Sequence, residues 1–105
     1  MEFIETPVFT RKITMFIDDV QYRQMQSVLI RDPKAGSLIP GAGGLRKLRW
    51  NLAGKGKRGG LRVIYYWYFS RSIILMLYAF RKSEAEDISR EHLKRLSEFV
   101  RGGTP

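Results

Sequence analysis

Apolar and polar residues alternate along residues 45–52 (LRKLRWNL), and a β-branched and aromatic run follows at residues 61–69 (LRVIYYWYF). The glycine-rich segment GKGKRGG lies between these two stretches. The pattern predicts two strands joined by a basic loop. Successive side chains of a strand point to opposite faces, so each strand should have one face that is more apolar than the other.

We expect the apolar faces of both strands to be buried under helices. They carry Leu48, Trp50 and Leu52 on the first strand and Val63, Tyr65 and Trp67 on the second. Cations and tyrosines should then converge on the open face of the sheet, namely Lys47, Arg49, Arg62 and Tyr66. Cationic and aromatic side chains suit a phosphate backbone and stacked bases, so this face is a candidate RNA-binding surface.

Helical spacing appears on both sides of these strands. Thr6-Pro7 is typical of an N-cap and first helical position, and Phe9, Ile13 and Ile17 follow at intervals of four residues. Asp18 and Gln21 have capping-box spacing and predict a second helix that ends at Asp32-Pro33. A further helix near the C-terminus has an apolar side formed by Leu93, Leu96, Phe99 and Val100.

The remaining segments complete the expected fold. Residues 2–5 form a short extended N-terminal strand, residues 34–44 form a glycine-rich loop, and residues 73–80, apolar on both faces, form the central strand. We therefore expect a single α+β domain over residues 1–105. Its small antiparallel sheet is packed by an N-terminal helix hairpin and a C-terminal helix, and residues 102–105 form a frayed tail.

Charge is distributed unevenly along the 105 residues. The net charge is +9, and residues 33–83 hold eleven Lys and Arg without any Asp or Glu, while the rest of the chain holds eight basic and ten acidic residues. The middle therefore carries +11 and the remainder −2, which favours a surface that binds a polyanion. Cysteine is absent and the longest apolar run is too short to span a bilayer, so we expect a cytoplasmic protein without a membrane partner.

Residues 54–59 match the dinucleotide-binding pattern G-x-G-x-x-G. That pattern requires a helix to follow, whereas strand-type sequence follows here. We instead expect its glycines to let the backbone approach an anion while Lys55, Lys57 and Arg58 neutralise phosphates.

The residue types available limit the possible chemistry. The only histidine, His92, lies among surface positions of the C-terminal helix, and no carboxylate occurs within the basic stretch. Magnesium prefers carboxylate ligands, so we expect no metal or other cofactor. Cleavage of RNA by its own 2′-hydroxyl remains possible, with Lys47, Arg49, Arg62 and Lys82 to move protons and neutralise charge. The sequence leaves the acid and base roles among them open.

At this point the chain resembles a known family. The blocks GAGGLRKLRW and GKGKRGGLRVIYY, followed by an apolar strand that ends in a lysine, are similar to the RelE superfamily and in particular to its HigB-type toxins. The resemblance implies a ribosome-dependent mRNA endonuclease with a RelE-like fold. It also implies a cognate antitoxin with a helix-turn-helix DNA-binding domain. The toxin would contact operator DNA only through this antitoxin.

Matched positions assign catalytic roles to Lys47, Arg62 and Lys82. Relatives usually have Lys-Asn-Glu at the last of these, whereas this chain has Lys82-Ser83-Glu84. RNA binding is then expected from the neighbouring cations and one tyrosine: Arg49, Lys55, Lys57, Arg58 and Tyr66. Two alternatives remain, a ParE-like toxin that inhibits DNA gyrase and an RNA-binding module without catalysis.

Overall fold

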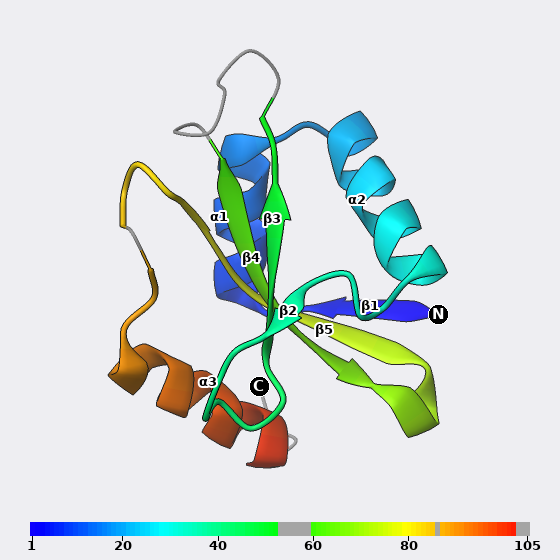
Figure 1. Ribbon diagram of the computed structural model, residues 1–105. Helices are drawn as coiled ribbons and strands as arrows, with labels where there is room; N and C mark the ends of the chain where they lie inside the picture. The colour runs from blue at the N-terminus through cyan, green and yellow to red at the C-terminus, as the bar shows by residue number, and fades with distance from the viewer. Residues whose placement is uncertain (53–59, 86, 103–105) are drawn as a thin grey trace.

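The computed structural model describes residues 1–52, 60–85 and 87–102 (Figure 1). The described residues form three α-helices, a 3₁₀ turn and one five-stranded sheet. In chain order they are β1 (Glu2–Glu5), α1 (Pro7–Phe16), α2 (Asp19–Arg31), β2 (Ser37–Leu38), β3 (Arg46–Trp50), β4 (Leu61–Tyr68), the turn (Phe69–Arg71), β5 (Ile73–Arg81) and α3 (Arg90–Gly102). The α+β class is therefore confirmed.

The sheet is mixed, which corrects the prediction of an antiparallel sheet. Its strand order is β1-β5-β4-β3-β2, and β1 runs parallel to β5 while the other pairs are antiparallel. The prediction that residues 73–80 form the central strand was wrong, because β4 occupies the centre and β5 lies between β1 and β4. Thr6 anchors the end of β1, because its N–H donates to Met76 O and its hydroxyl to Leu77 O. Strand direction is set by such long-range contacts, which local patterns do not encode.

The N-terminal helices begin where their capping residues predict. The Thr6 hydroxyl accepts a hydrogen bond from the N–H of Phe9, and Pro7 opens α1. Asp18 and Gln21 form both bonds of the capping box at the start of α2. The two helices pack on one face of the sheet over a core that includes Phe9, Ile13, Met25, Leu29, Leu48, Val63 and Tyr65.

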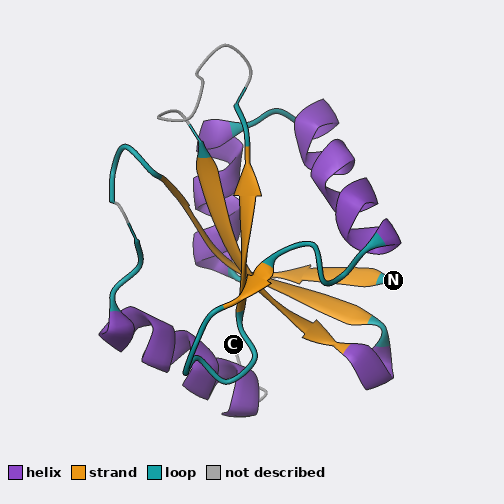
Figure 2. Ribbon diagram, viewed as in Figure 1, coloured by secondary structure: helices purple, strands orange, loops and turns teal. Residues whose placement is uncertain are grey.

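The opposite face of the sheet is not open, contrary to our expectation. α3 covers part of it, over a second core of Leu45, Ile64, Leu77, Phe80, Leu93 and Val100 (Figure 2). The cause lies in the sequence: Ile64 and the two-sided apolar β5 place apolar groups on this face, and the apolar side of α3 buries them. His92 packs edge-on against Tyr78, with 4.5 Å between ring centroids, as a helix-packing residue would.

The glycine-rich segment contains more order than predicted, because residues 37–38 pair with β3 as the short strand β2. Two side chains hold the chain just before it. The Tyr65 hydroxyl donates to Pro33 O and accepts from the N–H of Gly36, and Arg46 donates to Gly36 O at 2.8 Å. These bonds fix how the segment enters the edge of the sheet.

Candidate nucleic-acid interface

The register of β3 and β4 brings three of the predicted cations to one face. Arg49 stands directly opposite Arg62, and Lys47, two residues earlier on β3, stands opposite Ile64. Because Ile64 belongs to the core beneath α3, alternation places all three cations on the α3 side of the sheet. They lie toward the end of the face where β3 ends and β4 begins. Lys47, Arg49 and Arg62 are called the cationic cluster below.

Arg62 is the buried member of the cluster, with 9% of its surface exposed. Its Nη1 donates to the carbonyl of Leu61 at 3.3 Å. Burial lowers the pKa of Arg62, the nearby charge of Arg49 lowers it further, and Asp87 partly offsets both effects. Arginine remains charged under these conditions, so the site holds a poorly hydrated guanidinium that attracts anions strongly.

Lys47 has a counter-ion that sequence analysis missed. Its Nζ donates to Oδ1 of Asp87 at 3.1 Å, so a carboxylate from outside residues 33–83 lies beside the basic stretch in the fold. Asp87 belongs to the connection from β5 to α3, which runs down the side of the sheet in Figure 2. The separation of forty positions between the two partners explains the omission, because a charge pattern read along the chain does not show which segments meet.

The surroundings of Asp87 shift the pKa of its carboxyl group. Burial alone would raise it, but hydrogen bonds from the N–H of Ile88 and from Lys47, together with the charges of Lys47 and Arg62, hold the pKa below its ordinary value. Asp87 is therefore ionised at neutral pH and contributes one negative charge beside the cationic cluster.

Lys82 lies next to the cluster in register. Its N–H donates to the carbonyl of Gly60, which continues the pairing of β4 and β5 by one position beyond Leu61 and Arg81. Among the described residues, no hydrogen bond or ion pair joins its exposed side chain to Lys47 or Arg62. The preceding Arg81 belongs to the other face, where its guanidinium lies 5.4 Å from the Phe16 ring.

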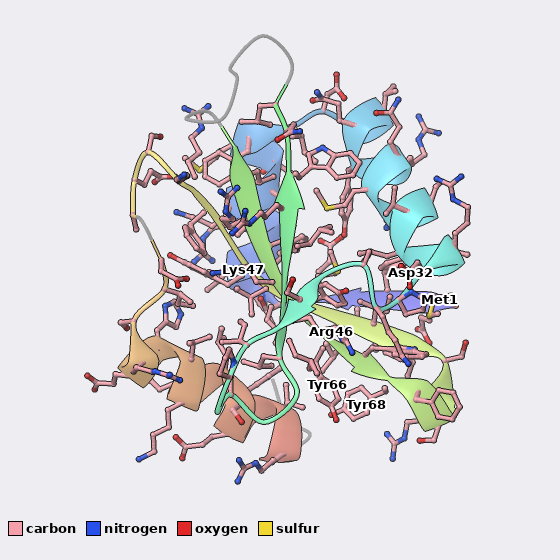
Figure 3. All side chains as sticks on the ribbon, in the orientation of Figure 1. Met1, Asp32, Arg46, Lys47, Tyr66 and Tyr68 are labelled. Carbon is pink, nitrogen blue, oxygen red and sulfur yellow. The ribbon has the colours of Figure 1, made fainter. Side chains whose placement is uncertain are left out.

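The structure does not bring Tyr66 to the cationic cluster. Tyr66 pairs with Leu75, packs edge-on against Tyr68 at 4.8 Å between ring centroids, and borders the core under α3. Figure 3 shows both tyrosines near the lower part of the sheet, away from Lys47. The three other predicted phosphate-binding residues, Lys55, Lys57 and Arg58, lie outside the described residues.

A cavity of about 480 Å³ opens beside the cluster. Its wall includes Lys47, Asp87 and Arg90 together with the apolar side chains of Leu38, Ile39, Pro40 and Ile88. Arg90, on α3, donates to Pro40 O at 2.8 Å and so ties the segment after β2 to the helix. In the part of the chain that the structure describes, no three His, Cys, Asp or Glu side chains cluster as metal ligands would.

No model of a protein family matches the sequence. None of the helices over residues 1–52, 60–85 and 87–102 combines the length and apolar character needed to cross a bilayer.

Proposed function

We propose that the protein is an endoribonuclease toxin of the RelE superfamily that cleaves translated mRNA on the ribosome. The cross-strand pair Arg49 and Arg62 carries this proposal. Like charges directly opposite each other destabilise an antiparallel pair, and burial of Arg62 increases that cost. A polyanionic ligand that binds both guanidinium groups accounts for their placement, and the phosphate backbone of RNA is such a ligand.

The proposed reaction uses the 2′-hydroxyl of the substrate as its nucleophile. The oxygen attacks the adjacent phosphorus, the bond to the 5′-oxygen breaks, and the products carry a 2′,3′-cyclic phosphate and a 5′-hydroxyl. Arg62 would neutralise the charge that builds on the phosphate, because a poorly hydrated guanidinium acts most strongly in a water-poor site. Lys47 and Lys82 would move the two protons, and Arg49 with residues 55–58 would hold the backbone of the RNA.

The ribosome and the antitoxin enter this proposal through the sequence resemblance. Ribosomal RNA would supply further phosphates for a strongly basic surface, and the ribosome would present the mRNA strand to the cluster. A cognate antitoxin with a DNA-binding domain would neutralise the toxin and connect it to operator DNA. The cytoplasm is the compartment in which all these partners meet.

The test is primer extension on a translated mRNA, with and without induction of the protein. The informative variant is Arg62→Lys, because it keeps the positive charge in a buried position while it removes the planar fork that binds a phosphate through two bonds. Arg23→Lys, on the exposed surface of α2, is the matched control. We expect new 5′ ends inside the reading frame with the native protein and the control, and their loss with Arg62→Lys.

Other outcomes distinguish the remaining functions. Intact mRNA together with a DNA-damage response would indicate a ParE-like gyrase inhibitor. Intact mRNA together with RNA binding by the purified protein would indicate a binding module without catalysis. Cleavage that persists unchanged in Arg62→Lys would remove Arg62 from the catalytic site.

A further inference from the structure

Asp87 is an unexpected component of a site that binds a polyanion. Of the ion pairs formed by the described residues, only the one with Asp87 reaches the cationic cluster. An ionised carboxylate repels the phosphates that the cluster attracts, so its presence weakens backbone binding unless it contacts another part of the ligand. That part must carry a hydrogen-bond donor, because an ionised carboxylate only accepts hydrogen bonds.

The two oxygens of Asp87 have different surroundings. Oδ1 accepts hydrogen bonds from Lys47 Nζ at 3.1 Å and from the N–H of Ile88 at 2.8 Å. Oδ2 takes part in none of the hydrogen bonds found among the described residues, and the side chain is 60% exposed. Lys47 and Ile88 thus hold the carboxylate in place by one oxygen, while the other keeps its capacity to accept a donor from a ligand.

The neighbouring cavity is large enough for a small molecule and carries both a cation and a carboxylate. Its volume of about 480 Å³ falls within the range of pockets that hold small molecules. Lys47 and Asp87 line the same cavity, so a cation for a phosphate lies next to an acceptor for a hydroxyl. In RNA the 2′-hydroxyl and the 3′-phosphate are attached to neighbouring carbons of one ribose, so a lysine and an aspartate in contact can bind both groups at once.

We propose that Asp87 reads the sugar of the bound nucleic acid: its free carboxylate oxygen accepts a hydrogen bond from the ribose 2′-hydroxyl of a nucleotide whose phosphate contacts Lys47. Deoxyribose lacks this hydroxyl and leaves the carboxylate facing a phosphate backbone without a donor. Asp87 therefore favours RNA over DNA in two ways, by attraction to ribose and by repulsion of any chain that offers only phosphates. This inference rests on the proposed RNA-binding function and adds a residue that determines specificity.

The experiment measures binding of the full chain to three fluorescent single-stranded 12-nucleotide probes of one sequence. The probes are RNA, DNA and 2′-O-methyl RNA, which keeps an RNA-like sugar but cannot donate from its 2′-oxygen. We expect the native protein to bind RNA about tenfold more tightly than either other probe, as one hydrogen bond to a charged group predicts. Gel analysis after each titration shows that the RNA probe remains intact.

Asp87→Ala should bind the three probes with similar affinity and bind DNA more tightly than the native protein does. Asp87→Asn keeps a neutral acceptor and should retain part of the preference, which guards against a change of fold in the alanine variant. Asp19→Ala, which removes the same charge from the exposed surface of α2, should keep the native preference.

Two results would overturn the inference. A native protein that binds 2′-O-methyl RNA as well as RNA, or an Asp87→Ala variant that keeps the native preference, shows that Asp87 does not read the hydroxyl. In both cases RNA binding itself persists and the proposed function stands. A native protein that binds none of the probes would remove the basis of the inference about Asp87, while the proposed cleavage on the ribosome would still be decided by primer extension.

Discussion

Arg49 and Arg62 face each other across β3 and β4, so that two guanidinium groups of the same charge occupy one face of the sheet. Such a pair lowers the stability of the folded protein rather than raising it. Asp87 offsets part of this repulsion, because its negative charge attracts Arg62. The free protein is thus less stable than it would be without this pair, and the proposed polyanionic ligand would reduce the repulsion.

Replacement of Arg49 should therefore stabilise the fold. We expect Arg49→Gln to raise the free energy of unfolding by a few tenths to about 1 kcal/mol, because it removes the like charge opposite Arg62. Urea unfolding of the native protein and the variant measures the change. Arg23→Gln, which removes an exposed cation from α2, should leave stability nearly unchanged. A destabilised Arg49→Gln variant would show that the two charges do not oppose each other.

The same substitution should weaken RNA binding. A lost phosphate contact reduces the slope of log affinity against log salt concentration by about 0.7 for a single strand. We expect this decrease in Arg49→Gln and an unchanged slope in Arg23→Gln, with both measured by fluorescence anisotropy over a range of salt concentrations. If the slope of Arg49→Gln equals that of Arg23→Gln, Arg49 lies outside the RNA-binding surface.

The ion pair of Asp87 predicts a dependence of stability on pH. The folded-state pKa of Asp87 lies below the unfolded value of 3.8, so the ionised group stabilises the folded protein above that value. This contribution disappears as the pH falls through the folded-state pKa. We expect Asp87→Ala to be less stable than the native protein by under about 1 kcal/mol at neutral pH, since the pair is partly exposed.

Urea unfolding of both proteins from neutral to acidic pH tests this prediction. The difference between native protein and Asp87→Ala should be constant at neutral pH and should vanish at the acidic end. A difference that stays the same throughout would mean that the charge of Asp87 does not contribute to stability.

The capping box of α2 predicts the effect of one further substitution. Asp18→Ala removes the acceptor for the N–H of Gln21 and should lower the free energy of unfolding by about 1 kcal/mol. Asp19→Ala, one residue further along the chain, removes an exposed carboxylate that makes no capping bond. This variant should lower the free energy of unfolding clearly less than Asp18→Ala does. Thermal unfolding of the two variants compares them, and equal losses would contradict the assignment of the cap.

Tyr66 should contribute to stability rather than to RNA binding. A Cβ atom at Gly44, which has φ +98°, would lie 2.9 Å from the Tyr66 ring, whereas one at Gly41 would meet only the end of Arg90 at 3.5 Å. Both glycines have positive φ, so both alanine variants are strained, but only Gly44→Ala must also displace the ring. We expect a larger loss of stability in Gly44→Ala by thermal unfolding, with unchanged RNA affinity in both folded variants.

Local patterns in the sequence were sufficient to predict much of this fold. Capping residues such as Thr6 and Asp18 located the helix starts, because a cap acts on backbone groups within the same turn. Alternation correctly placed Lys47, Arg49 and Arg62 on one face, because the period of a strand is a local property.

Contacts between distant segments could not be predicted from such local patterns. The parallel direction of β1 depends on its pairing with β5, some seventy residues away. The position of α3 on the second face depends on Ile64 and β5 together, and it moved Tyr66 from the expected open surface to the border of a core. Asp87 was missed for the same reason, since its charge meets Lys47 only in the folded chain.

The most direct measurement of the central claim uses a translated mRNA with a single 2′-deoxynucleotide at a mapped cleavage position. The 2′-hydroxyl is the proposed nucleophile, so we predict cleavage of the all-ribose message to a 2′,3′-cyclic phosphate and no cleavage at the deoxynucleotide. Cleavage that continues at the deoxynucleotide would contradict the account, because the cationic face of the sheet would then have no nucleophile to align.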